Sequence, residues 1–214
     1  MHDVVDKLVS IKKEIQSNNS RAEIIAVSKT FPLNKILPLI NSGHIHYGEN
    51  KIQEAMDKWM DIKKDFQNIK LHFVGKLQTN KVKFALPLFD YIHSLDSLKL
   101  ADKIANEQQK KKFKPKIFIQ VNIGKEKQKN GIDIESLDKF YTDCRNNFDL
   151  NIVGLMCLPP NDNIPEKYFS EMQRLIKNMK PQELSMGMTN DYMVALKYGS
   201  TFLRIGSKIF GPRG

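Results

Sequence analysis

The stretch IIAVSKT, residues 24–30, runs from a short apolar, β-branched segment straight into a polar turn. Seven further segments of this kind follow it, and longer charged, amphipathic segments separate most of them. The pattern predicts eight strands, at Ile24–Ser28, Ile45–Gly48, Leu71–Gly75, Tyr91–Leu95, Ile117–Ile123, Ile152–Cys157, Glu183–Gly187 and Phe202–Gly206.

Helices are expected where apolar residues recur every three or four positions. The expected helices are Val4–Gln16, Asn34–Ser42, Gln53–Phe66, Leu98–Lys111, Pro165–Lys180 and Asp191–Tyr198. Strands that alternate with helices pair in parallel, and eight of them in an undivided chain predict a closed barrel. We therefore expect an α/β fold, a single (β/α)8 TIM-type barrel domain over residues 1–214, with an additional N-terminal helix.

A doubly wound open sheet is the alternative fold. A sheet of that kind that binds a dinucleotide would show G-x-G-x-x-G after its first strand. Here the first strand runs into Ser28-Lys29-Thr30 instead, so that fingerprint is missing.

Composition narrows the class of protein. The chain has 214 residues, 41% of them hydrophobic and 27% charged, as in ordinary globular proteins. No apolar run approaches the roughly 20 residues of a membrane span, and the start of the chain is not a signal peptide, so we expect a cytoplasmic protein without a membrane partner. Cys144 and Cys157 have no neighbours at metal-ligand spacing, which argues against zinc or a disulfide framework.

The net charge of +10 raises the possibility of a nucleic-acid partner. The lysines, however, are spread along most of the chain. The densest runs, at residues 110–116 and 125–129, lack the series of interleaved aromatic residues that a stacking platform needs. A solvated surface is the favoured interpretation, and a nucleic-acid-binding module rests on charge alone.

Lys29 stands directly after an apolar strand, and in barrels the chemistry gathers at the carboxyl ends of the strands. Burial of an ammonium group is costly, so a desolvated lysine has a lowered pKa and a free amine that can attack an aldehyde. Taken alone, this segment favours a surface lysine that opens a loop. The residues at the other strand ends decide between a reactive lysine and a surface lysine.

The second strand ends at Gly48-Glu49-Asn50, where Asn50 offers both a donor and an acceptor, or equally caps a helix after a turn. The Gly75-Lys76 pair after the third strand is not a P-loop, because Leu77 replaces the required Ser or Thr.

The seventh and eighth strand ends carry small and hydroxylic residues, at 185–190 and 204–207. Barrels often bind phosphate with the loops after these two strands. By strand alternation, Leu203 and Ile205 face the helices and Arg204 faces the barrel interior. An inward arginine needs a partner, either a structural ion pair or a ligand near the barrel mouth.

Taken together, these segments resemble the pyridoxal-phosphate homeostasis protein family, whose fold is similar to the barrel domain of bacterial alanine racemase. The resemblance covers nearly the whole chain. It is carried by AVSKTFP at 26–32, HYGENKIQEA at 46–55, LHFVGKLQTNK at 71–81, IHSLDSLKLADKI at 92–104, VNIGKEKQKNGI at 121–132, VGLMCLPP at 153–160, LSMGMTNDY at 184–192 and GSTFLRIGSKIFGPR at 199–213.

The resemblance implies pyridoxal 5'-phosphate as the cofactor, bound as a Schiff base on Lys29. It places Asn50 beside the pyridine ring and Arg204 opposite the pyridine nitrogen. It assigns the phosphate to two turns, formed by Ser185, Gly187 and Thr189 and by Gly206 and Ser207. The departures keep a hydroxyl or a ring: Thr189 stands where serine is commoner, Ser207 where threonine is commoner, and Tyr47 where phenylalanine is commoner.

The function that this resemblance implies is a monomeric carrier that buffers the cofactor and passes it to pyridoxal-phosphate-dependent apoenzymes. The alternative is an amino-acid racemase that uses the same cofactor. Racemisation needs an acid/base group on each face of the substrate. The racemase family takes one of them from a separate C-terminal domain, and the sequence ends at Gly214. The carrier is therefore the favoured function, without efficient catalysis.

Overall fold

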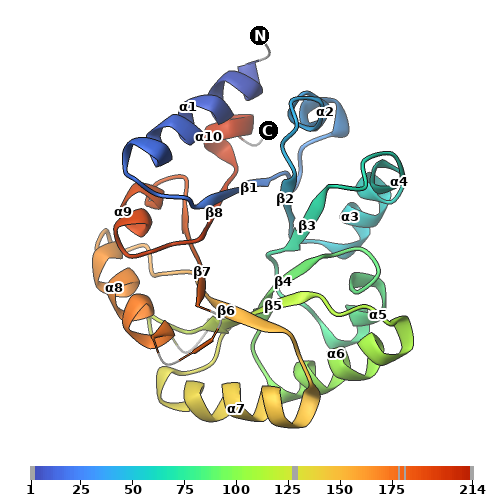
Figure 1. Cartoon of the computed structure of the whole chain (residues 1–214), viewed down its shortest axis with the longest axis vertical. Helices are drawn as coiled ribbons and strands as arrows, with labels where there is room; N and C mark the ends of the chain where they lie inside the picture. The colour runs from blue at the N-terminus through green and yellow to red at the C-terminus, as the bar shows by residue number, and fades with distance from the viewer. Residues whose placement is uncertain (1–2, 127–129, 178, 181, 213–214) are drawn as a thin grey trace.

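Eight parallel strands close into one barrel, in chain order, with β8 paired to β1 (Figure 1). The computed structural model describes residues 3–126, 130–177, 179–180 and 182–212. Three features of the sequence analysis lie wholly or partly outside these residues. They are the family-like stretch at 121–132, the lysine run at 125–129, and Arg213. The strands are β1 Glu23–Val27, β2 His46–Glu49, β3 Lys70–Phe73, β4 Tyr91–Leu95, β5 Lys116–Val121, β6 Ile152–Cys157, β7 Glu183–Met188 and β8 Phe202–Ile205. The predicted TIM-type barrel is confirmed.

The helices lie outside the strands, as in Figure 1. They are α1 Asp3–Ser17, α2 Leu33–Asn41, α3 Ile52–Trp59, α4 Ile62–Asp65, α5 Val82–Ala85, α6 Leu98–Lys111, α7 Leu137–Phe148, α8 Pro165–Ile176, α9 Tyr192–Lys197 and α10 Ser207–Phe210. The single helix expected at Gln53–Phe66 is wrong, because the chain breaks it between α3 and α4. Within the described part of the chain, no helix combines the length and the apolar character needed to cross a membrane.

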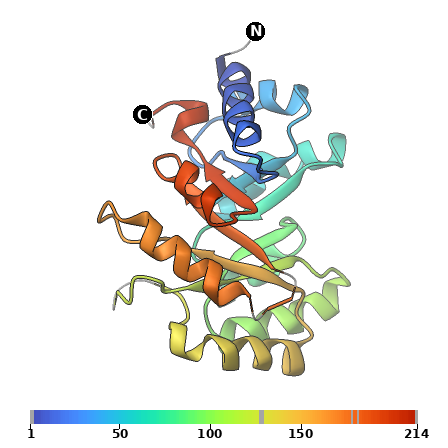
Figure 2. The same cartoon turned by 60° about the vertical axis from the view of Figure 1, so that its left-hand side comes forward.

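The expected N-terminal helix is present and packs beside α10, near the two ends of the chain (Figure 2). It buries Val4, Leu8, Ile11 and Ile15, one face at helical spacing. On the same helix, Glu14 accepts hydrogen bonds from the Tyr192 hydroxyl and from Lys208 Nζ, the latter at 3.0 Å. Because Lys208 follows Ser207, this contact ties the first helix to the segment after β8.

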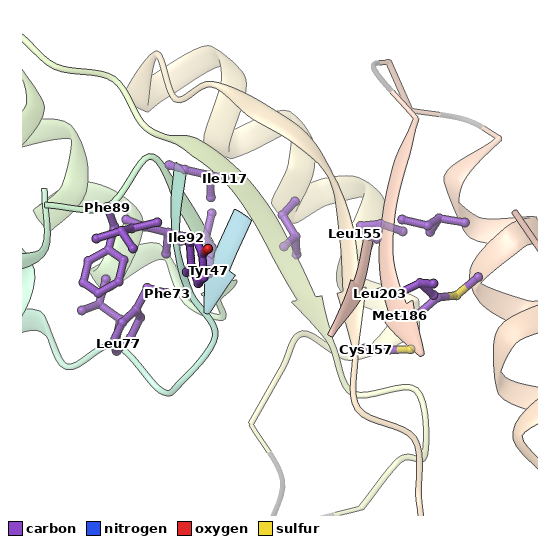
Figure 3. Packing of buried hydrophobic residues seen from close by; sticks show 14 of the residues in the cluster. Tyr47, Phe73, Leu77, Phe89, Ile92, Ile117, Leu155, Cys157, Met186 and Leu203 are labelled. Carbon is purple, nitrogen blue, oxygen red and sulfur yellow. The ribbon is translucent and has the colours of Figure 1, made fainter. Parts of the chain in front are cut away.

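The apolar core has two layers. The outer layer fills the space between strands and helices, and Figure 3 shows parts of it, with Phe73 and Ile92 in one group and Leu155 and Leu203 in another. The inner layer fills the barrel with a smaller apolar cluster: Ile25, Val27, Tyr91, Phe118, Val153, Met156 and Phe202. The alternation expected for β8 is confirmed, because Leu203 and Ile205 belong to the outer layer and Phe202 to the inner one.

Candidate functional site

A cavity of about 440 Å³ opens where the strands end, at the carboxyl edge of the barrel. Active sites of TIM barrels lie at this edge. The cavity is lined by Val27, Lys29, Val74, Leu158, Pro159, Pro160, Asn161, Met188, Thr189, Asn190, Asp191, Arg204, Gly206 and Ser207. A cavity of similar size, about 480 Å³, lies on the outer surface around Met60 and Phe84. We assign the site to the first because it gathers a lysine, an arginine and two hydroxyl groups.

Five of the eight residues expected at the site meet in this cavity. They are Lys29, Thr189, Arg204, Gly206 and Ser207. They come from the ends of β1 and of the last two strands, β7 and β8, and the closure of the barrel between β8 and β1 brings the two ends of the chain together.

The turn that carries Lys29 is anchored by hydrogen bonds to the carboxylate of Glu49, whose side chain is fully buried. One oxygen of Glu49 accepts hydrogen bonds from Ser28 Oγ at 2.8 Å, Lys58 Nζ at 2.9 Å and Trp59 Nε1 at 3.0 Å. The ammonium group of Lys58 also donates to the carbonyl of Ser28 at 2.9 Å. The residue before Lys29 is thus fixed through both its side chain and its backbone.

The residue after Lys29 is fixed as well. Thr30 adopts a φ of +68°, which is uncommon for a residue other than glycine. Its N–H donates to Glu54 at 2.5 Å, and the same Glu54 oxygen accepts from Lys58 at 3.1 Å. With both neighbours held by α3, the backbone of Lys29 has one orientation, and its half-buried side chain lines the cavity.

Arg204 forms part of the cavity wall although its side chain is buried. Its NH1 donates to the carbonyl of Ser185 at 2.6 Å and to Ser185 Oγ at 2.7 Å, and its NH2 donates to the carbonyl of Cys157 at 2.8 Å. A guanidinium group has five N–H donors, so two remain without an acceptor among the described residues. Burial lowers the pKa of Arg204 from its ordinary value. The expected inward arginine is confirmed, with backbone and hydroxyl partners.

Two hydroxyl groups meet at the other end of the cavity. Ser207 Oγ, at the start of α10, donates to Thr189 Oγ1 at 3.2 Å. The turn that presents Thr189 is closed by the Met188 N–H, which donates to the Asp191 carboxylate at 2.5 Å. Both hydroxyls lie beside Gly206 in the wall of the cavity, where they can donate to an anion.

Asn50 lies just outside the cavity lining. It follows β2, and the next wall residue, Val74, is anchored by its N–H to the carbonyl of Glu49 at 2.8 Å. Gly75 packs so closely that a Cβ there would lie 2.4 Å from the Asn50 carbonyl oxygen. Asn50 Oδ1 is buried and has no hydrogen-bond partner within the described residues. A buried acceptor of this kind is ready for a donor brought by a ligand.

Ser185 and Gly187 do not reach the cavity, because β7 continues to Met188 instead of ending at Gly187. Ser185 is therefore three residues inside the strand, and its fully buried Oγ is bonded to Arg204 and to His93. Gly187 has a φ of +90°, and a Cβ there would lie 2.7 Å from the Cβ of Ala195 on α9. These two residues lie behind the wall that Thr189 and Arg204 form.

The wall opposite Lys29 was not anticipated. It is the segment after β6, Leu158–Pro160 with Asn161, together with Asp191. The only signal for it is a pair of prolines directly after a strand, which reads equally well as a plain turn. Burial raises the pKa of the Cys144 and Cys157 thiols to about 12. Among the described residues, no three acidic, histidine or cysteine side chains form a metal site.

Comparison with known proteins gives a consistent result. A family model described as the N-terminal domain of alanine racemase matches residues 7–214. The pyridoxal phosphate homeostasis protein of Haemophilus influenzae is 34% identical over 220 residues, covering 98% of this chain and 93% of that protein. The structure of PipY from Synechococcus elongatus PCC7942 covers 97% of this chain and 100% of that chain. Its TM-score is 0.90 without PLP (29% identity) and 0.86 with PLP bound (30% identity).

Proposed function

This chain belongs to the pyridoxal phosphate homeostasis protein family and carries an alanine racemase N-terminal domain, and we propose that it binds pyridoxal 5'-phosphate as a Schiff base on Lys29. One observation carries the proposal: Lys29, Arg204 and the hydroxyls of Thr189 and Ser207 line a single cavity. When bound, the cofactor supplies an aldehyde that condenses with a primary amine and releases water.

Each wall of the cavity fits one part of this cofactor. Lys29 presents the amine to the aldehyde carbon. Asn50, just outside the cavity lining, would lie beside the ring with its unpartnered buried oxygen, and the N–H donors of Arg204 that the protein leaves unused would bind the ring nitrogen. The hydroxyls of Ser207 and Thr189, with the backbone at Gly206, hold the phosphate. Gly187 packs on α9 behind this phosphate turn, whereas Ser185 supports Arg204 at the ring nitrogen.

Arg204 points to weak catalysis, although it does not by itself separate a carrier from a racemase, because the racemase family uses the same arrangement. Arg204 can only donate hydrogen bonds, so it would hold the ring nitrogen unprotonated, which makes the ring a weaker sink for electrons. We propose that the protein buffers the cofactor in the cytoplasm, as a single domain and a monomer, and releases it to apoenzymes that depend on it. The hydrolysis of the Schiff base at Lys29 by water reverses its formation, so loading and release use the same group.

Borohydride reduction tests the covalent link to Lys29. We expect the protein mixed with pyridoxal phosphate and reduced to carry one pyridoxyl group on the peptide that contains Lys29, as measured by peptide mass mapping. Lys29→Ala should carry none, and Lys76→Ala, which removes an exposed lysine after β3, should label as the unchanged protein does. A label on another lysine, or on none, would refute the assignment.

Loss of the Ser207 hydroxyl tests the phosphate end of the cavity. A hydrogen bond to a charged group contributes about 1.5–3 kcal/mol, so Ser207→Ala should weaken binding of pyridoxal phosphate about tenfold or more. Binding of unphosphorylated pyridoxal, measured by the same absorbance titration, should hardly change. Ser170→Ala, on the exposed face of α8, is the matched control. A similar loss for both ligands would place the phosphate elsewhere.

A further inference from the structure

A chain of three histidine rings crosses the interior of the barrel below the cavity. His46 Nδ1 lies 2.8 Å from His72 Nε2, and His72 Nδ1 lies 2.9 Å from His93 Nε2. His93 Nδ1 lies 2.9 Å from Ser185 Oγ, which in turn accepts from Arg204 NH1 at 2.7 Å. The rings come from three successive strands, β2, β3 and β4, and the cofactor site uses none of them directly.

Arg204 decides the direction of every hydrogen bond in this chain. A guanidinium group can only donate, so Ser185 Oγ accepts from it and keeps its own hydrogen for the next partner. The serine oxygen has a second lone pair, but if it also accepted from His93 its own hydrogen would have no acceptor among the described residues, so the hydroxyl donates to His93 Nδ1, which carries no hydrogen. The hydrogen of His93 is therefore on Nε2, and it is donated to His72 Nδ1.

The same step repeats along the chain. His72 has its Nδ1 occupied as an acceptor, so its hydrogen is on Nε2 and is donated to His46 Nδ1. His46 then carries its hydrogen on Nε2, at the far end of the barrel. If His72 were charged or held the other tautomer, its Nδ1–H would face the Nε2–H of His93 in a buried place, and one of the two would lose its bond.

We propose that Arg204 imposes one tautomer, with hydrogen on Nε2, on His93, His72 and His46, and that Ser185 and His93 in return act as positioning residues for the Arg204 guanidinium. The proposal for the tautomers concerns the protein without cofactor. Its consequence for the cofactor, a fixed pair of donors facing the ring nitrogen, rests on the proposed function.

The geometry favours a fixed support over a path for proton transfer. One end of the chain is an arginine, which does not release its proton in proteins. The rings are also wedged between aromatic side chains: His72 stacks on Tyr91 with centroids 4.1 Å apart, and His93 stacks on Phe118 at 4.4 Å. A ring held in this way cannot turn over to reset the chain after a proton has passed.

Nitrogen NMR of the cofactor-free protein, labelled with ¹⁵N at histidine, tests the proposal directly. We expect the ring-nitrogen shifts and couplings to show Nε2–H for His72, His93 and His46. An Nδ1–H tautomer at His93 or His72 would overturn the proposal. This measurement needs neither a variant nor a bound ligand, so it stands apart from any failure of the proposed function.

Ser185→Ala supplies the second test, because it removes the hydroxyl that links Arg204 to His93. The His93 tautomer should then become mixed, and affinity for pyridoxal and for pyridoxal phosphate should fall severalfold and by equal factors, unlike the phosphate-selective loss for Ser207→Ala. Ser200→Ala is the matched control, since Ser200 Oγ is also buried but bonds only to backbone carbonyls, of Leu184, Met186 and Phe202. An unchanged His93 tautomer in Ser185→Ala would contradict the role of the serine.

Discussion

Acidification from pH 7 to pH 5 is expected to remove a large part of the stability of this protein. Burial lowers the pKa of His44 to about 3 and that of His46 to about 4, and it lowers the pKa values of His72 and His93 well below the ordinary value of 6.5. His44 and His46 are neutral in the folded protein at pH 5, and His72 and His93 take up protons less readily when folded, whereas in the unfolded chain all four rings take up protons once the pH falls below about 6.5. The unfolded state therefore binds more protons, and stability falls as the pH falls.

The size of the effect follows from the number of rings. At pH 5, His44 and His46 each shift the balance by roughly 2 kcal/mol, and His72 and His93 add to the shift in the same direction, against a total stability of about 5–15 kcal/mol for a protein of this kind. Asp90 opposes the shift at His46, and Lys70, Lys116 and Lys12 add to it. The carboxylates act in a lower window: the Tyr192 bond lowers the pKa of Glu14, a contribution that is lost only below about pH 4.5.

Urea unfolding at a series of pH values measures this effect. The free energy of unfolding should decline between pH 6.5 and 5, with a slope that steepens from about two protons toward four as the rings of the unfolded chain become fully protonated. His46→Gln removes one of the four titrating rings, so its slope should be smaller by nearly one proton. A flat profile down to pH 5 would mean that the rings are protonated in the folded protein, and that the chain of neutral histidines does not exist.

The strands were predictable because this sheet is parallel and buried on both faces, which leaves short, continuous apolar runs. Tyr91–Leu95 and Ile152–Cys157 match the observed strands at both ends, and the other six differ by one or two residues. The helix Leu137–Phe148 was not expected, although its buried residues Leu137, Phe140 and Cys144 keep helical spacing. Its exposed positions carry Thr, Asp and Asn, which are weak helix formers and hide the signal.

The lining of the candidate cavity was predictable where strand ends carry unusual residues, as at Lys29, Arg204 and Ser207. It was not predictable where an error of one residue in the end of a strand decides whether a side chain lines the cavity or stays buried. Ser185 is the example: Gly187 looked like the end of β7, yet the register shift between Ser185 and Met188 lets the strand run on, so the serine stays buried. The histidine chain was also hidden, since no local pattern shows that rings from three strands meet.

Replacing Lys58 with methionine is expected to cost about 3–5 kcal/mol of stability, the usual effect of removing one partner of a buried ion pair. The Lys58 side chain is 8% exposed and that of its partner Glu49 is fully buried. In Lys58→Met the Glu49 carboxylate keeps only the Ser28 and Trp59 donors, and its second oxygen already has no partner among the described residues. The loss is therefore that of an uncompensated buried charge, directly beneath the turn of Lys29.

Two further variants show whether the buried charge is the cause. Glu49→Gln combined with Lys58→Met removes both charges and keeps an oxygen that accepts from Ser28 and Trp59, so it should recover much of the lost stability. Lys64→Met breaks an exposed ion pair in which Lys64 Nζ lies 2.7 Å from Asp61, close to the spacing of the buried pair, and should change stability little. Urea unfolding at pH 7.5, where the histidine rings contribute no pH dependence, measures all three.

If Lys58→Met is as mild as Lys64→Met, the buried pair does not hold the Lys29 turn. If it is severe and the double variant is equally severe, packing of the lysine stem is the cause instead of charge.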